Sequence, residues 1–299
     1  MSIKYSICMC NYNMSDTIER SLKSILNQID SSFEVVLVDD GSSDNSVKIV
    51  QNLQLKYNNL RLVELKRDHQ RKLGFTRNIA IKNARGKYVM LHLDCDDIFG
   101  PHLKDFVCLF EKLEKAAGQN ILLSGQHINM ADREFLLSHG PYKNIYRGED
   151  RDLWSRLATT GQYIPFDHVD FVIRLPKPYK RKVLKSIYDT FDHMVNDFRF
   201  GTSLLKYLEL EVNKWHLFSF KILFMRMLLI FPSWIVSLFK DKISNEDSIG
   251  GFEEFSNYRG RARGTYKELM SKYGASVDMS FISHAAKKIF DVNKQVEKG

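Results

Sequence analysis

Short apolar runs alternate with amphipathic stretches along the first part of this 299-residue chain, and this alternation constrains the fold more than any other feature. The apolar runs predict buried strands at residues 3–10, 33–38, 60–65, 87–93 and 120–128. Between them, apolar residues recur at helical spacing, and helices are expected to begin near Ser15 and Val47 and to cover residues 74–84 and 101–117. This order predicts an α/β fold with a mostly parallel sheet flanked by helices.

Polar clusters directly follow three of the predicted strands. They are Asn11-Tyr12-Asn13, Asp39–Asp44 and Asp94–Asp97. In open α/β sheets, ligands bind in the crevice outside the carboxyl ends of the strands. The sequence therefore predicts a ligand site at one edge of the sheet, where the three clusters gather.

Two aspartates in the third cluster have the spacing of a metal-binding pair. Asp94 and Asp96 stand two residues apart at the exit of a strand, with Asp97 adjacent. In extended backbone such residues project to one side, and neighbouring carboxylates repel unless a cation lies between them. Hard oxygen ligands favour Mg²⁺ or Mn²⁺ over zinc. The alternative is a polar turn whose aspartates cap the next helix.

Three more residues near this edge have both a functional and a structural interpretation. Asp40 can accept hydrogen bonds from a nucleotide base or ribose, or it can belong to an ordinary Asp-Gly turn. Tyr12 can stack on a base, or it can pack at the rim of the core. Arg77 can reach a diphosphate or a base, or it can form a surface ion pair.

The sequence lacks the motifs of several other enzyme classes. No GxGxxG opens a helix after the first predicted strand, which disfavours a dinucleotide-binding site. The P-loop pattern, the GxSxG elbow and the HExxH pattern do not occur. His92 falls inside a predicted strand and is expected to be a packed core side chain rather than a ligand.

A pair of acidic residues opens another predicted helix, EDRDLWSRLATTG, which begins at Glu149 and Asp150. Acidic side chains at a helix N-terminus often only complement the helix dipole. In the functional interpretation, Asp150 is a general base that deprotonates an acceptor hydroxyl.

Taken together, these segments resemble the family 2 inverting glycosyltransferases, which have the Rossmann-like glycosyltransferase type A fold. The matching stretches are YSICMCNYNMSDTIERSLKSIL, VVLVDDGSSDNSVKIV, GFTRNIAIKNARGKYVMLHLDCDD and GEDRDLWSRLATTG. They occur in the family's order and cover roughly residues 3–162. Cys10 and Asn11 depart from the family's pattern, because Pro and Thr are frequent at these places. This departure bears on the fit around the base.

The resemblance implies a donor site for a nucleotide-diphosphate sugar. Tyr12 and the backbone near Cys10 would line the base. Asp40 would bind the base, and Asp39 would support the turn that carries it. Arg77 would contact the nucleotide.

The resemblance also implies the metal site and the catalytic base. Asp94 and Asp96 would form the DxD pair, with Asp94 touching the ribose and Asp96 binding a Mg²⁺ or Mn²⁺ ion on the diphosphate, and Asp97 would be an adjunct to that pair. Asp150 would be the catalytic base, supported by Glu149. The acceptor oxygen would attack the anomeric carbon opposite the leaving group, and the anomeric configuration would invert.

The positive charge of the chain is confined to its second part. Residues 1–170 carry no net charge, whereas residues 171–299 carry the whole net charge of +8. The neutral first part argues against nucleic acid as a partner, and the basic second part fits an anionic surface. The sequence thus predicts a catalytic domain at 1–170 and a basic helical region at 171–299. The densest basic patch consists of Arg174, Lys177, Lys180, Arg181, Lys182 and Lys185.

An apolar segment at residues 215–239 lies within the basic region. On a helical wheel its few polar residues fall near one stripe, formed by Ser219, Arg226, Ser233, Ser237 and Lys240. The pattern favours a helix in the interface of a membrane, and the alternative is a helix buried in a subdomain. The four cysteines form no CxxC pair and the N-terminal apolar run is too short for a signal peptide. We therefore expect a cytoplasmic protein, peripheral on the cytoplasmic face of a membrane.

The resemblance implies a metal-dependent hexosyl- or N-acetylhexosaminyl-transferase that acts on a hydroxyl of a lipid-linked or polysaccharide glycan. A polyprenyl-phosphate sugar synthase of the same fold is one alternative. A phosphate acceptor is already ionised and needs no general base, so Glu149 and Asp150 argue against it. A catalytically silent scaffold that binds sugar nucleotides is the other alternative. The presence of Asp40, Asp94, Asp96 and Asp150 argues against that one.

Overall fold

The computed structural model describes residues 2–145, 147–176, 183–213, 216, 219–243, 248–249 and 251–291, without the side chains of residues 183–186 and 252. The chain forms two compact units. The first comprises Met1–Asn144, Gln162–Pro178 and Ala262–Gly299, and the second comprises Ile145–Gly161 and Tyr179–Arg261. Neither unit is therefore one continuous stretch of sequence.

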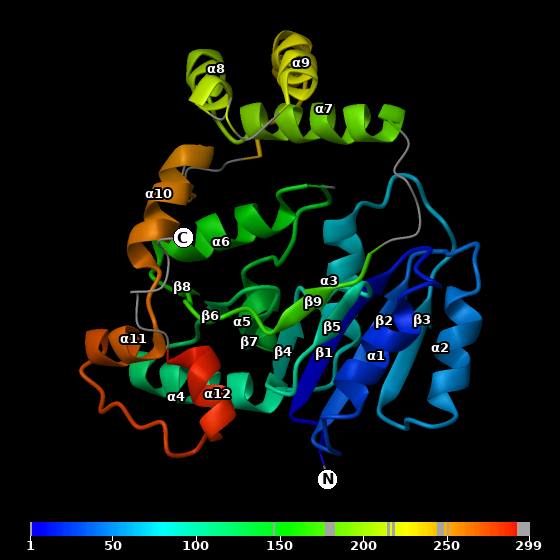
Figure 1. Ribbon diagram of the computed structural model, residues 1–299, viewed down its shortest axis with the longest axis vertical. Helices are drawn as coiled ribbons and strands as arrows, with labels where there is room; N and C mark the ends of the chain where they lie inside the picture. Colours follow the sequence, from blue (N-terminus) through cyan, green and yellow to red (C-terminus); the bar gives the residue numbers. More distant parts are fainter. Residues whose placement is uncertain are drawn as a thin grey trace. The chain divides into compact units, whose positions relative to one another are not determined.

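A seven-stranded sheet forms the centre of the first unit, in the order β3-β2-β1-β4-β7-β6-β8 (Figure 1). Its strands are β1 (Tyr5–Asn11), β2 (Phe33–Asp39), β3 (Leu60–Glu64), β4 (Tyr88–Leu91), β6 (Leu122–Ser124), β7 (Asn129–Asp132) and β8 (Tyr163–Pro165). The four strands β1 to β4 are all parallel to one another. Strand β7 is antiparallel to both of its neighbours, β4 and β6. A separate ribbon pairs β5 (Asp97–Phe99) with β9 (Val172–Arg174) in antiparallel fashion.

Helices cover both faces of this sheet, which is why β2 is buried along its whole length. Helices α1 (Ile18–Leu26) and α4 (Leu103–Ala117) close the main hydrophobic core with Ile7 and Met9 of β1. Helix α2 (Ser46–Gln54) contacts α1 and β3. Helix α3 (Leu73–Asn83) packs on β1 and β2, and α5 (Arg133–Ser138) packs on β7.

The predicted fold class is confirmed, because the sheet is mostly parallel and lies between helices. All five predicted strands are present, although the last of them is short and covers only β6. The sequence did not predict β5, β7, β8 and β9, each of which has three or four residues. Runs of this length are too short to show a period.

Residues that follow the second unit in the chain return to the core of the first unit. Helix α11 (Tyr266–Lys272) contacts α4, and α12 (His284–Phe290) brings the buried Phe290 into the core. The Phe290 ring stacks on Phe166 with 6.0 Å between centroids, and its centroid lies 5.5 Å from that of His168. The last described helix therefore completes a core that the N-terminal half begins.

His168 makes the first unit sensitive to acid. The ring is 2% exposed, Nε2 accepts the backbone N–H of Gln126 at 2.9 Å, and Nδ1 lies 2.8 Å from the Val169 carbonyl oxygen. Burial lowers the pKa of His168 to about 4. Between this value and the ordinary value near 6.5, the unfolded chain binds a proton that the folded chain does not. The contribution that the neutral His168 makes to the stability of the fold is therefore fully present above about pH 6.5 and is lost as the pH falls toward 4.

We expect the free energy of unfolding to fall by about 3 kcal/mol between pH 7 and pH 4 on account of this one histidine. Urea unfolding followed by circular dichroism at several pH values measures the loss. His168→Gln should remove that part of the pH dependence, because its amide does not titrate. Equal pH dependence in the two proteins would contradict the assignment.

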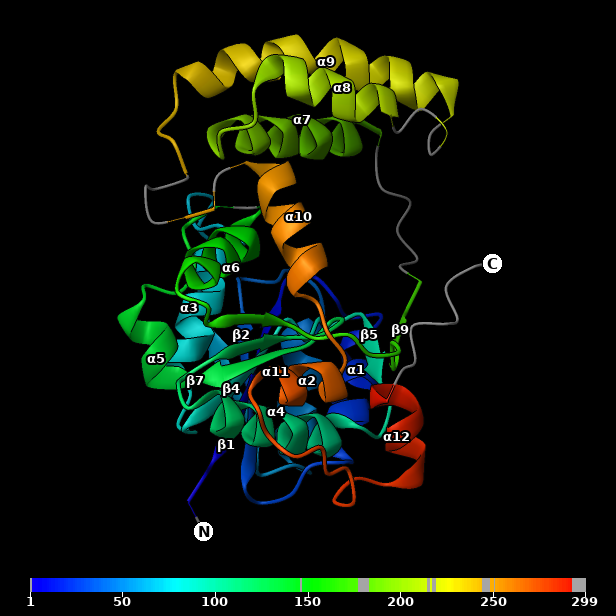
Figure 2. The same cartoon turned by 90° about the vertical axis from the view of Figure 1, so that its left-hand side faces the viewer.

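In the residues that the structure describes, the regular elements of the second unit are helices. They are α6 (Glu149–Thr159), α7 (Val183–Arg199), α8 (Leu204–Asn213), α9 (Phe220–Leu238) and α10 (Phe252–Ala262). Helix α9 packs against α7 and α8 (Figure 2). Helix α6 is tied to α7 by Arg151, whose Nη2 lies 2.6 Å from Asp197 Oδ1 and whose guanidinium lies 4.2 Å from the Phe200 ring centroid. Helix α6, which carries Asp150 in its first turn, thus belongs to the same body as α7.

Helix α9 has its buried polar groups on the inner side, together with the core residue Ile230, and mostly apolar groups on its outer side, where Lys221 is also exposed. Arg226 donates from Nε and Nη2 to the two carboxylate oxygens of the buried Glu211 on α8, at 2.6 and 2.7 Å. Ser233 and Ser237 are buried and donate to carbonyl oxygens of their own helix. The exposed residues of α9 include Phe220, Ile222, Phe224, Leu228, Phe231, Ile235 and Leu238. Within the part of the chain that the structure describes, α9 alone is long and apolar enough to cross a membrane.

The polar stripe predicted from the sequence is therefore largely an inward face, and only Ser219 and Lys240 at its ends are exposed. Of the predicted basic patch, Arg174 is the residue with a described side chain, and the other five fall outside the described side chains. The division at residue 170 into a catalytic domain and a C-terminal region is a division by function and stays a prediction.

Candidate active site

The turn after β2 is held by a side chain from the end of β1. Asn11 Nδ2 donates to Asp39 Oδ2 at 2.6 Å and to Ser42 Oγ at 3.1 Å. Asp39 Oδ1 accepts the Ser42 N–H at 2.8 Å. Gly41 has a φ of +75°, and a Cβ at this position would lie 2.5 Å from the backbone nitrogen of Arg67, so only glycine fits here. Asn11, where the chain departs from the family's pattern, thus fixes Asp39.

Asp40 is bonded to two arginines from the loop after β3. Arg67 Nη1 donates to Asp40 Oδ2 at 2.6 Å, and Arg71 Nε donates to Oδ1 at 2.5 Å. The Arg67 guanidinium also lies 4.2 Å from the centroid of the Tyr12 ring, which is 43% exposed. Asp40 and Tyr12, the two residues predicted to contact a base, are therefore brought together, and Arg67 contacts both of them.

Arg77 on α3 lies in a small polar group beside the end of β4. Its Nη1 is 3.2 Å from His92 Nε2, and its guanidinium lies 5.5 Å from the Tyr142 ring centroid. The Tyr142 hydroxyl is also 3.2 Å from His92 Nε2. The prediction that His92 is a packed core side chain is wrong. His92 lies beyond the end of β4, half-buried, with a φ of +68°.

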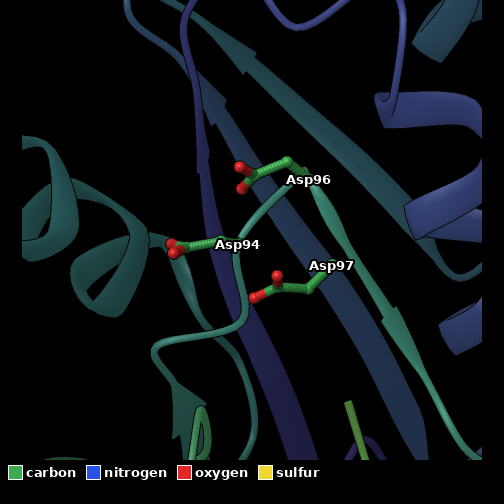
Figure 3. A group of neighbouring side chains, drawn as sticks. All are labelled: Asp94, Asp96 and Asp97. Carbon is green, nitrogen blue, oxygen red and sulfur yellow. The ribbon is translucent and has the colours of Figure 1, made fainter. Parts of the chain in front are cut away.

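The three aspartates after β4 form a compact cluster (Figure 3). Carboxylate oxygens of Asp94, Asp96 and Asp97 lie within 4.8 Å of one another. Asp96 and Asp97 are buried and Asp94 is half-buried. The thiol of Cys95 donates to the Cys10 carbonyl oxygen at 3.3 Å, which ties this turn to the end of β1. The three polar clusters predicted to gather at one edge of the sheet do so.

Arg174 on β9 lies against this cluster. Its Nε and Nη2 donate to the two oxygens of Asp97, at 2.9 and 3.1 Å, and Nη2 also donates to Asp94 Oδ2 at 3.1 Å. Burial raises the pKa of the Asp94 carboxyl, and repulsion by Asp97 and Asp96 acts in the same direction, while Arg77 and Arg174 oppose it. Two carboxylates and two guanidinium groups thus surround Asp94, and burial decides the direction in which its pKa moves.

The cluster fits a hard divalent ion. All its donor atoms are carboxylate oxygens, which suit Mg²⁺ or Mn²⁺. Both oxygens of Asp97 are bonded by Arg174, so Asp94 and Asp96 are the residues to hold an ion. Ions of this kind commonly use one or two carboxylates and complete their shell with substrate phosphates. A two-carboxylate set therefore suits an ion that arrives with a diphosphate.

The predicted base lies at the start of α6 in the second unit. Gly148 before it has a φ of +82°, and a Cβ there would lie 2.9 Å from the Phe200 ring, so the helix start requires glycine. Glu149 is buried, and Asp150 Oδ1 accepts the N–H of Arg151 at 2.7 Å. Asp150 belongs to the second unit, whereas every predicted donor-binding residue belongs to the first.

Three residues at this edge were missed from the sequence, namely Arg67, Arg71 and Arg174. The first two lie in the basic run KRDHQRK directly after a predicted strand, and that position was a usable signal. Arg174 is 77 residues from its partner Asp97, and nothing local in the sequence links them. Antiparallel pairing of β5 with β9 creates the contact.

The curated proteins that match this chain include several glycosyltransferases. The chain is 37% identical over 100 residues to poly(ribitol-phosphate) beta-glucosyltransferase of Bacillus spizizenii, a match that covers 33% of this chain and 16% of that protein. It is 33% identical over 92 residues to the Escherichia coli UDP-Glc:alpha-D-GlcNAc-diphosphoundecaprenol beta-1,3-glucosyltransferase WfaP, covering 31% of this chain and 35% of that protein. The matches thus span about a third or less of these relatives' length.

Solved structures with the same fold include S. aureus TarS. Its 1–349 fragment in complex with UDP-GlcNAc matches 94% of this chain and 95% of that chain, with a TM-score of 0.55 and 17% identity. The same fragment in complex with UDP matches 73% of each chain, with a TM-score of 0.50 and 19% identity. At such low identity the likeness shows the fold alone, which is the glycosyltransferase type A fold.

The family assignment comes from the sequence model described as "Glycosyl transferase family 2". It matches residues 6–187, which is more than half of the chain. The match runs from β1 through the acidic cluster and α6 into the start of α7. The chain belongs to glycosyl transferase family 2.

Proposed function

We propose that this protein is an inverting glycosyltransferase that moves a sugar from a nucleotide-diphosphate sugar to a hydroxyl of a glycan acceptor. The observation that carries the proposal is that Tyr12 after β1, Asp40 after β2 and the acidic cluster after β4 all belong to one edge of the sheet. A nucleotide sugar needs recognition of a flat base and of an anionic diphosphate, and this edge offers groups for both.

On the donor side, the side chains of the first unit bind and orient the nucleotide. Asp40 accepts a hydrogen bond from the base, the Tyr12 ring stacks on it, and Arg77 contacts the nucleotide. A base that stacks on the face of Tyr12 next to Arg67 would take the place now held by the Arg67 guanidinium. A divalent ion held by Asp96, with Asp94 beside it, would stabilise the charge that develops on the departing nucleoside diphosphate.

On the acceptor side, Asp150 is the general base in this proposal. Its carboxylate takes the proton of the acceptor hydroxyl as the acceptor oxygen attacks the anomeric carbon from the face opposite the diphosphate. The C–O bond to the diphosphate breaks as the new glycosidic bond forms, and the configuration inverts. The bond from the Arg151 N–H orients Asp150 at the helix start, and the buried Glu149 beside it in the chain is the supporting residue in this proposal.

A lipid-linked or polysaccharide glycan is the acceptor class that we propose, with a hexosyl or N-acetylhexosaminyl group transferred. Two E. coli relatives, WfaP and WfgD, are named for transfer to a sugar on diphosphoundecaprenol, and the Bacillus relative is named for transfer to poly(ribitol-phosphate). These names describe those proteins, and they support the acceptor class proposed for this one.

We further propose that the protein binds the cytoplasmic face of a membrane through α9. Its exposed residues are mostly large apolar side chains, with Lys221 near the start of the helix, and the charge of Arg226 is neutralised on the inner side by Glu211. A helix that turns its polar side inward and its apolar side outward is suited to the interfacial layer of a bilayer. Lipid binding would bring a lipid-linked acceptor to the enzyme.

The proposed reaction is tested with a panel of nucleotide sugars that includes UDP and GDP sugars, with Mg²⁺ or Mn²⁺ present. Release of nucleoside diphosphate should occur with a restricted set of donors and should stop in excess chelator. Asp96→Ala should reduce it by about 10²-fold or more, the scale expected when charge stabilisation at the leaving group is lost. Asp30→Ala, which removes a surface partner of Lys104, is the matched control. Full activity in excess chelator would refute the metal assignment.

A further inference from the structure

The β5–β9 ribbon places Arg174 on the acidic cluster. Arg174 and Asp97 lie directly opposite each other in this ribbon, and the Leu175 N–H donates to the Asp96 carbonyl oxygen at 2.7 Å. The guanidinium meets both oxygens of the fully buried Asp97. Because removing one partner of such a buried pair leaves an uncompensated charge, this contact is an anchor.

The bond from Arg174 to Asp94 has a different character. Only one hydrogen bond, of 3.1 Å, joins the two residues, and the side chains of Arg174 and Asp94 are 53% and 47% exposed. Solvent weakens an exposed ion pair of this kind, so the Arg174 nitrogen can leave Asp94 for another acceptor at little cost in free energy. Arg174 is therefore fixed at Asp97 and exchangeable at Asp94.

The positive side chains beside the cluster oppose the binding of a divalent ion in the absence of other ligands. The guanidinium groups of Arg77 and Arg174 both place positive charge beside the Asp94 carboxylate. A divalent ion at Asp94 would have to replace the Arg174 nitrogen and remain beside its positive charge. A diphosphate would add negative charge and supply another acceptor for that nitrogen.

We propose that Arg174 is a positioning residue that keeps divalent-ion binding at the acidic cluster weak until a nucleoside diphosphate is present. When the diphosphate binds, Nη2 leaves Asp94 for a phosphate oxygen, and Asp97 keeps the guanidinium in place. Ion and nucleotide then raise each other's affinity by the same factor. The inference rests on the proposed function, because it takes the donor diphosphate as the ligand of this edge.

The test is a titration of the full chain with Mn²⁺, read from the electron paramagnetic resonance signal of free Mn²⁺, with and without UDP or GDP. Arg174→Gln should bind Mn²⁺ alone at least tenfold more tightly than the parent, and UDP or GDP should then increase its Mn²⁺ affinity by a smaller factor. Arg263→Gln, which removes a partner of Asp167 in the same unit, should behave as the parent does. Asp96→Ala should bind Mn²⁺ poorly in every case.

Arg174→Lys guards against misfolding of the glutamine variant. A lysine ammonium cannot hold both oxygens of Asp97 and also reach Asp94, so Mn²⁺ alone should bind about threefold more tightly than to the parent. Unchanged or weaker Mn²⁺ binding by the Arg174 variants would overturn the inference. If the same proteins still bind UDP or GDP, the donor site itself is upheld. Absence of binding of UDP, GDP and Mn²⁺ by the parent protein would refute the donor site and the inference together.

Discussion

Asp150→Asn should bind the donor as tightly as the parent protein and transfer sugar at least about 10²-fold more slowly. The amide has nearly the same shape as the carboxylate but cannot accept the proton of the acceptor hydroxyl. Donor affinity should be unchanged because the predicted donor-binding residues belong to the first unit and Asp150 to the second. Isothermal titration with the nucleotide sugar gives the affinity, and single-turnover transfer at saturating donor gives the rate.

Glu253→Gln is the matched control for this experiment. Glu253 is also an acidic residue in the first turn of a helix of the second unit, and it pairs with Lys206 at the surface. Its substitution should leave the transfer rate unchanged. Weaker donor binding with an unchanged transfer rate in Asp150→Asn would assign Asp150 to binding instead of proton transfer.

A double substitution on α9, Phe224→Ser with Phe231→Ser, should lower binding to anionic liposomes on the order of 10²- to 10³-fold. Both rings are more than half exposed, so the fold loses little when they are replaced. Inserting each ring into the interface is worth about 2 kcal/mol. Co-sedimentation of the full chain with liposomes over a range of lipid concentrations measures the change.

The control for the liposome experiment is Leu55→Ser, which removes an apolar side chain that is 84% exposed at the end of α2 in the first unit. It should leave liposome binding unchanged, because α2 is not part of the α9 face. A parent protein that is monodisperse without detergent and does not sediment with liposomes would favour burial of α9 against a protein partner.

The predictable part of this structure is the part encoded by local sequence patterns. Period and strand-end chemistry identified β1 to β4, and the aspartates after β2 and β4 followed from where ligands bind in such sheets. The turn at Asp39 was likewise visible, although its anchor Asn11 looked like a departure from the family. These features depend on residues that are close together in the chain, so they can be recognised from the sequence.

The features that escaped prediction depend on distant pairing. Arg174 reaches the acidic cluster only because β9 pairs with β5, and each strand is three residues long. Arg226 interrupts an apolar segment in the sequence, yet Glu211 on another helix compensates its charge. A helical wheel gives the stripe to which Arg226 belongs. It does not tell which side of the helix meets the rest of the protein.

The return of α11 and α12 to the first unit has a consequence for how the protein is made. The ribosome releases the chain from its N-terminus, so α9 emerges before residues 262–291. At that moment the core of the first unit lacks Phe290, whose ring later packs against Phe106 and Phe166. With the membrane binding proposed above, the apolar face of α9 would meet lipid before the core of the first unit is complete.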